Sequence, residues 1–150
     1  MREPGPLQPA SGTLAGKTHR LPVRVYWEDT DAGGVVYHAA YLKFMERART
    51  DFLRLLGIEQ AELLADPAAP VKFAVKSLSI DYHQPAELDD ALVIETEVRD
   101  IKPASLVMAQ TVKRGETTLA EATIRVAVLT GQGQPTRPPA ALADAFRKMK

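Results

Sequence analysis

The chain has 150 residues, of which 45% are hydrophobic, and its 19 basic and 19 acidic side chains leave a formal net charge of zero. This length and composition are typical of one soluble domain with a buried core. The sequence contains no basic block of the kind that binds nucleic acid, and no apolar run approaches the ~18 residues that a membrane helix needs. Without cysteine, the chain has no disulfide framework and no catalytic thiolate.

The first twenty residues are rich in proline and glycine and contain few large apolar side chains. They lack the apolar core of a secretory signal, so we expect a flexible tail. A cytoplasmic protein is the default expectation, although the absence of cysteine alone does not exclude the periplasm. The chain is therefore divided into an N-terminal tail over residues 1–20, a folded domain over residues 21–130, and a C-terminal loop and short helix over residues 131–150.

The first predicted elements are a strand and a long helix. Valines alternate with larger side chains over Leu21–Trp27, which predicts a strand. From Ala39 to Leu56 the apolar residues recur at steps of three and four, and Gly57 follows as a helix stop. The predicted apolar stripe consists of Leu42, Met45, Ala48, Phe52 and Leu55. A short second helix is predicted over Glu59–Leu64.

After this helix the apolar period changes to two. A long strand is predicted over Val71–His83, and its apolar residues switch faces, which predicts a bulge near Lys76-Ser77. Three further strands are predicted, with inward faces formed by Leu92, Ile94, Thr96 and Val98, by Leu106, Met108, Gln110 and Val112, and by Ala120, Ala122, Ile124, Val126 and Val128. A terminal amphipathic helix is predicted over Ala140–Lys150.

The order of these elements favours an α+β fold in which one long helix lies across one antiparallel sheet. Such a sheet leaves an open edge and a second face to cover. Self-association is therefore expected.

The loop before the long helix is the segment most suited to chemistry. Asp29 and Asp31 stand two residues apart, so in an extended backbone their side chains point the same way. One can be catalytic while the other fixes the turn, or both can simply form the turn, as aspartate commonly does before glycine. Gly33 and Gly34 allow the main chain to approach a ligand closely.

The start of the helix, around Tyr37–Ala40, has no residue that commonly caps a helix N-terminus. Its first N–H groups are then free to stabilise an oxyanion, unless the His38 ring caps them.

Other kinds of site find less support in the sequence. The three histidines, His19, His38 and His83, do not have the spacing of a metal site. The sequence also has no phosphate-binding loop, no dinucleotide-binding glycine motif and no serine-hydrolase elbow.

The loop before the long helix, together with two later segments, gives the chain a clear resemblance to a known family. The segments that carry it are Val25–His38 with the following Tyr41, Phe44–Arg49, and Asp81–Asp90. Through them the chain resembles the hotdog-fold acyl-CoA thioesterases of the 4-hydroxybenzoyl-CoA thioesterase type, especially the bacterial branch associated with the Tol–Pal envelope system. The resemblance covers roughly Leu21–Thr130.

The resemblance implies a hotdog fold, in which a five-stranded antiparallel sheet wraps a long central helix. It implies a homodimer or homotetramer with the active site between two subunits. The implied reaction is hydrolysis of an acyl-CoA or acyl-carrier-protein thioester, without cofactor or metal. Asp31 would act as nucleophile or general base, and the backbone N–H of His38 would polarise the thioester carbonyl. Gly34, Tyr37 and Tyr41 are expected to contact the substrate.

Two alternatives remain open at this point. One is a hotdog dehydratase or hydratase that uses His38 with Asp31, and the other is a non-catalytic acyl-binding scaffold. The acyl group is also open: Phe44, Met45, Phe52 and Phe73 fit either an acyl pocket or an ordinary core. The candidates for binding coenzyme A phosphates, which equally fit solvated surface charge, are Lys72, Lys76, Arg99 and Lys102.

Overall fold

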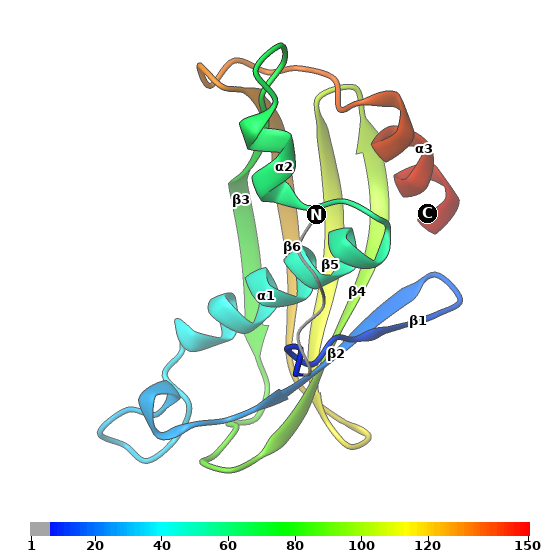
Figure 1. Ribbon diagram of the computed structural model, residues 1–150. Coiled ribbons are helices and arrows are strands. Elements are labelled where there is room, and N and C mark those ends of the chain that lie inside the picture. Colours follow the sequence, from blue (N-terminus) through cyan, green and yellow to red (C-terminus); the bar gives the residue numbers. More distant parts are fainter. Residues whose placement is uncertain (1–6) are drawn as a thin grey trace.

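The computed structural model describes residues 7–150. Within that range the elements form one sheet and a set of helices (Figure 1). In chain order they are β1 (Thr13–Ala15), β2 (Thr18–Arg24), the 3₁₀ helix η1 (Trp27–Asp29), α1 (Ala40–Leu55), α2 (Gln60–Ala65), β3 (Val71–Tyr82), β4 (Ala91–Lys102), β5 (Ser105–Arg114), β6 (Thr117–Thr130) and α3 (Ala140–Met149).

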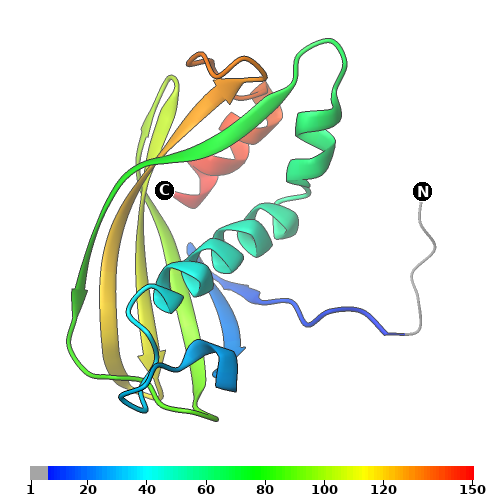
Figure 2. The same cartoon turned by 90° about the vertical axis from the view of Figure 1, so that its left-hand side faces the viewer.

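The sheet has six strands in the order β1-β2-β4-β5-β6-β3, and every neighbouring pair is antiparallel. Figure 2 shows that α1 and α2 lie on the same side of this curved sheet. This α+β architecture confirms the hotdog fold that the resemblance implied, with one strand more than the five expected. The additional strand is β1.

The alternation predicted for the last three strands is confirmed. All thirteen residues named above as their inward faces are buried in the structure. Helix α1 contributes the other side of the core through Tyr41, Phe44, Met45, Ala48, Phe52 and Leu53. The predicted stripe on this helix is partly wrong, because Leu42 is only half-buried and Leu55 is 38% exposed. The buried face is offset by about one residue from the stripe that the spacing suggested.

The expectation of a flexible tail is wrong for residues 13–20. Strands β1 and β2 form a hairpin there, and His19 is completely buried. Residues 1–6 of the expected tail lie outside the described residues. The predicted strand over Leu21–Trp27 in fact begins at Thr18 and ends at Arg24, because its partner β4 begins at Ala91, opposite Arg24.

The remaining predictions of secondary structure are confirmed closely. Strand β3 has a register shift against β6 between Val75 and Ser77, where the change of face predicted a bulge. Helix α1 is followed by Gly57 at a φ of 85°, and the N–H of Ile58 bonds to the carbonyl of Leu53 at 2.9 Å. This is the Schellman arrangement that glycine favours after a helix.

Candidate active site

The loop that leads into α1 is organised by the buried carboxylate of Asp29, which is 6% exposed. Its Oδ2 accepts the N–H of Tyr26 at 2.8 Å, and its backbone carbonyl accepts the N–H of Tyr37 at 2.8 Å. Asp29 therefore ties the start of the loop to its end. Because it ends η1, the two aspartates do not lie on an extended backbone and do not share one environment.

Asp31, in contrast, is exposed. Its Oδ1 accepts the N–H of Gly33 at 2.8 Å, which closes a tight turn. Within residues 7–150 its Oδ2 has no hydrogen-bond partner. The backbone on both sides is fixed, since the N–H of Asp31 bonds to the carbonyl of Val35 at 2.9 Å and its carbonyl accepts the N–H of Gly34 at 3.0 Å. Gly34 has a φ of 82°, a conformation that side chains with a Cβ rarely adopt.

The start of α1 carries free donors. Ala39, the N-cap residue, has no side-chain capping bond, so the alternative in which the His38 ring caps the helix is wrong. The N–H of His38 makes no hydrogen bond to any residue that the structure describes. The His38 ring instead packs against the Tyr37 ring in a tilted arrangement, with 4.5 Å between ring centroids and 56° between the ring planes. An uncapped helix start of this kind suits a developing negative charge.

The expected substrate-contacting residues differ in exposure. Gly34 is exposed and Tyr37 is 48% exposed, so both can meet a ligand. Tyr41 is only 2% exposed, and its hydroxyl accepts the N–H of Ala86 at 2.9 Å. The structure therefore places Asp31, Gly34, Tyr37 and the His38 backbone on one exposed loop, while Tyr41 lies in the core beneath it.

The second motif lies directly against this loop. The N–H of Val36 bonds to the carbonyl of Ala86 at 2.9 Å, and Val35 forms an isolated bridge with Glu87. Asp90 holds this segment by accepting the N–H of Glu87 and a hydrogen bond from Arg114. Burial tends to raise the pKa of Asp90, but these two donors together hold that pKa below its ordinary value.

Sequence reasoning gave no role to Tyr82, although it lies in this second motif. Its hydroxyl donates a hydrogen bond to the backbone carbonyl of His38 at 2.7 Å. The contact joins residues 44 positions apart, so no local pattern in the sequence reveals it. Burial, with a smaller contribution from Tyr41, raises the pKa of the Tyr82 hydroxyl.

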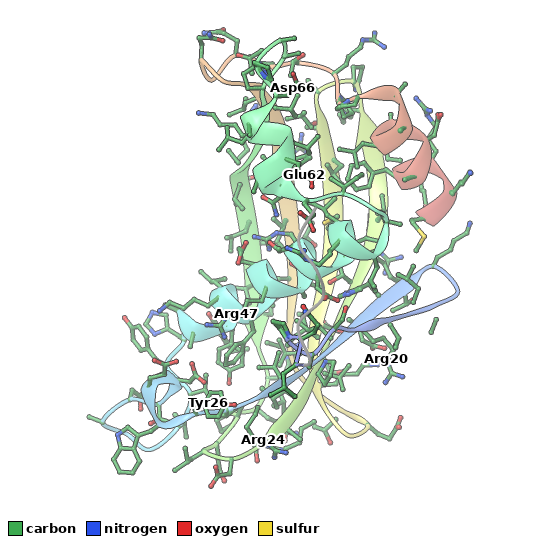
Figure 3. All side chains as sticks on the ribbon, viewed as in Figure 1. Arg20, Arg24, Tyr26, Arg47, Glu62 and Asp66 are labelled. Atoms are coloured by element: carbon green, nitrogen blue, oxygen red, sulfur yellow. The ribbon has the colours of Figure 1, made fainter. Side chains whose placement is uncertain are left out.

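Two hollows flank α1. One, of about 130 Å³, is lined by Phe73 together with Arg49 and Phe146, whereas Phe44, Met45 and Phe52 are wholly buried in the core. The other is an open groove of about 440 Å³ between β2 and α1. Figure 3 labels three of the residues that line this groove, namely Arg24, Tyr26 and Arg47.

The four candidate residues for coenzyme A phosphates give no cluster. Lys72, Lys76 and Lys102 are exposed, and Arg99 pairs with Glu97 at 3.0 Å. In the part of the chain that the structure describes, no group of three or more histidine, aspartate or glutamate side chains is placed to hold a metal. None of its helices is long and apolar enough to cross a membrane.

Comparison with known proteins places the chain in a family. The family model of the thioesterase superfamily matches residues 33–121. The acyl-CoA thioesterase YbgC of Haemophilus influenzae is 48% identical over 131 residues, which cover 87% of this chain and 95% of that protein. The acyl-CoA thioester hydrolase YbgC of Escherichia coli O6:H1 is 50% identical over 100 residues, or 67% of this chain and 72% of its own.

Among solved structures, a probable thioesterase from Bartonella henselae superposes with a TM-score of 0.79 at 36% identity, covering 81% of this chain and 99% of that one. The same architecture is thus shared by a protein with substantial sequence identity. On the family match and these identities together, the chain belongs to the thioesterase superfamily.

Proposed function

We propose that this protein hydrolyses the thioester bond of an acyl-CoA, with Asp31 as the catalytic carboxylate and the backbone N–H of His38 as a donor to the thioester carbonyl. The observation that carries the proposal is that two groups without a protein partner among residues 7–150 lie on one fixed loop. Asp31 has a carboxylate oxygen without a partner in residues 7–150, and the N–H of His38 is likewise free there. The relatives named as acyl-CoA thioesterases support the substrate class.

In this mechanism the substrate carbonyl accepts the N–H of His38, and the positive end of α1 stabilises the oxyanion that forms on attack. Asp31 either attacks the carbonyl carbon, which gives a mixed anhydride that water then hydrolyses, or removes a proton from the attacking water. The leaving thiolate corresponds to a thiol with a pKa near ~8.5, so it departs without a strong general acid. Both routes yield a carboxylic acid and free coenzyme A.

The hydratase alternative finds less support. It requires His38 and Asp31 to act as a pair, but the described part of the chain contains no hydrogen bond between them, and the His38 ring packs against Tyr37. A non-catalytic scaffold would not need the free carboxylate of Asp31. The acyl-carrier-protein substrate, the cytoplasmic location and the Tol–Pal association expected from the sequence stay predictions.

The proposal is tested with Asp31→Asn, which keeps an oxygen for the Gly33 turn but removes the charge. Thiol release from a panel of short, long and aromatic acyl-CoA esters should fall by at least ~10²-fold. Glu28→Gln is the matched control, since Glu28 is an exposed carboxylate in the same loop, and it should retain wild-type turnover.

Wild-type turnover in Asp31→Asn would remove Asp31 from the mechanism. Hydration of enoyl-CoA by the wild-type protein, measured alongside, would favour the hydratase. Tight binding of acyl-CoA without turnover would favour the scaffold.

A further inference from the structure

The contact between Tyr82 and His38 joins the end of strand β3 to the start of helix α1. At 2.7 Å, the distance between the Tyr82 hydroxyl and the His38 carbonyl oxygen is the most common one for an O–H···O hydrogen bond. The donor comes from the second sequence motif and the acceptor from the first. The bond therefore couples the two motifs at the point where the free N–H groups lie.

The His38 carbonyl is open to this bond because His38 precedes Ala39, the N-cap residue of α1. The first intrahelical bond of an α-helix is accepted by the N-cap carbonyl, so no N–H of the helix is required to bond to the carbonyl before it. Here the N–H of Leu42 bonds to Ala39 at 3.2 Å, and the N–H of Ala40 bonds to Tyr37 at 2.8 Å, both only three residues back. The His38 carbonyl accepts no backbone N–H within residues 7–150, and the Tyr82 hydroxyl supplies its donor.

The bond to the His38 carbonyl also orients the neighbouring backbone N–H groups. The His38 carbonyl and the Ala39 N–H belong to one planar peptide group, so a bond to the oxygen sets the direction of that N–H as well. The His38 N–H belongs to the preceding peptide group, which is joined to this one at the Cα of His38. A hydrogen bond accepted by the carbonyl also polarises the peptide group and strengthens its N–H as a donor.

Tyr82 itself is held firmly enough for this role. Its ring packs edge-on against Tyr41, with 5.3 Å between centroids and an angle of 73° between planes. Tyr41 is buried and bonded to Ala86. Like an ordinary tyrosine, Tyr82 is a protonated donor at neutral pH, and burial raises the pKa of its hydroxyl further above 10.0.

We propose that Tyr82 is a positioning residue for the thioester hydrolysis proposed above, on which this inference rests: its hydroxyl orients the backbone N–H groups at the start of α1 toward the thioester carbonyl. Tyr82 touches no reacting atom. It acts on the transition state through the His38–Ala39 peptide group, whose Ala39 N–H makes no hydrogen bond within residues 7–150 and would join the His38 N–H as a donor to the thioester carbonyl.

The test is Tyr82→Phe, which removes the hydroxyl and keeps the ring against Tyr41. We expect kcat to fall roughly 10-fold, less than the ~10²–10³-fold that loss of a direct oxyanion donor costs, with KM changed by less than about twofold. Tyr26→Phe is the matched control, because Tyr26 is 62% exposed and its hydroxyl donates no hydrogen bond within residues 7–150. It should leave both constants unchanged.

A second readout reports on the donors directly. An acyl-CoA analogue with a methylene group in place of the thioester sulfur and a ¹³C-labelled carbonyl is bound to each variant, and its carbonyl stretch is recorded by infrared spectroscopy. In Tyr82→Phe the stretch should move back toward its value in water. A purely structural role for Tyr82 would lower the melting temperature without moving this band.

Unchanged kcat and an unchanged carbonyl band in Tyr82→Phe, with Asp31→Asn inactive, would overturn the inference and leave the proposed function standing. Wild-type turnover in Asp31→Asn would instead overturn the proposed site itself. A rise in KM alone in Tyr82→Phe also counts against the inference, because it would indicate a role in ground-state binding.

Discussion

Two aspartates two residues apart in the candidate site have separate tasks. Each carboxylate accepts one backbone N–H, from Tyr26 at Asp29 and from Gly33 at Asp31, but Asp29 is buried whereas Asp31 is exposed. A substrate can reach the exposed carboxylate of Asp31, whereas the buried carboxylate of Asp29 is held inside the loop. The difference in environment thus separates the structural acid from the proposed catalytic one.

We predict that Asp29→Ala lowers the free energy of unfolding by about 1 kcal/mol, the typical cost of losing a capping side chain. Turnover should fall as well, because Asp29 joins both ends of the loop that carries Asp31. Urea unfolding and thiol release measure the two effects. Glu28→Ala, at the exposed neighbour, should change stability by no more than ~0.5 kcal/mol. Equal stability of the two variants would contradict the role given to Asp29.

Among the elements, the β1–β2 hairpin is held to α1 by one side chain of the helix. Asp51 accepts hydrogen bonds from the Ser11 hydroxyl at 2.8 Å and the Gly12 N–H at 2.9 Å, and its Oδ2 lies 2.7 Å from Nε2 of His19. Burial acts to raise the pKa of Asp51, but the bonds from His19, Ser11 and Gly12 together hold that pKa below its ordinary value of 3.8.

The lowered pKa of Asp51 gives a prediction with a defined sign. A carboxyl whose pKa is lower in the folded state stabilises the fold above its unfolded pKa, and this contribution is lost as the pH falls through the folded pKa. Asp51→Asn should therefore cost about 1.5–3 kcal/mol at pH 5, the range for hydrogen bonds to a charged group. The difference from wild type should shrink as the pH falls below 3.8. Urea unfolding at several pH values measures it, and a difference that does not change with pH would contradict this account.

The sequence predicted the elements whose own side chains encode them. The one-sided burial of β4, β5 and β6 appears as plain alternation, and the bulge in β3 appears as a change of face. The hairpin was missed because β1 is a three-residue edge strand whose support comes from Asp51, nearly forty residues away. The bond from Tyr82 to His38 was missed for the same reason, since contacts between distant segments leave no periodic trace.

In the molecule as a whole, the two edges of the sheet differ. One edge is the short β1, whereas the other is the twelve-residue β3. Within residues 7–150 nothing pairs with the outer side of β3, and it exposes Val75 at 46% and Leu78 at 40%. A long apolar edge of this kind favours pairing with another strand, which agrees with the self-association expected from the sequence.

We predict that the wild-type protein is a homodimer or homotetramer and that Leu78→Lys shifts it to the monomer, because a buried charge at the edge opposes pairing. Light scattering after size-exclusion chromatography measures the change. Turnover should fall with it if the site lies between two subunits. Leu64→Lys is the control, since Leu64 is an exposed leucine on α2. A monomeric wild type, or an unchanged assembly in Leu78→Lys, would refute the edge as the interface.

Gln110 reaches from the middle of β5 into the core, where it is completely buried. Its amide nitrogen donates to the Met45 carbonyl and the Thr96 hydroxyl, and its amide oxygen accepts a bond from Arg49, each at 2.9 Å. Apolar contacts fix the position of a helix along a sheet through the fit of their side chains, and hydrogen bonds add a requirement of direction. The hydrogen bonds of the Gln110 amide can all form at only one position of α1 along the sheet. They therefore fix the distance between the N-terminus of α1 and the end of β3.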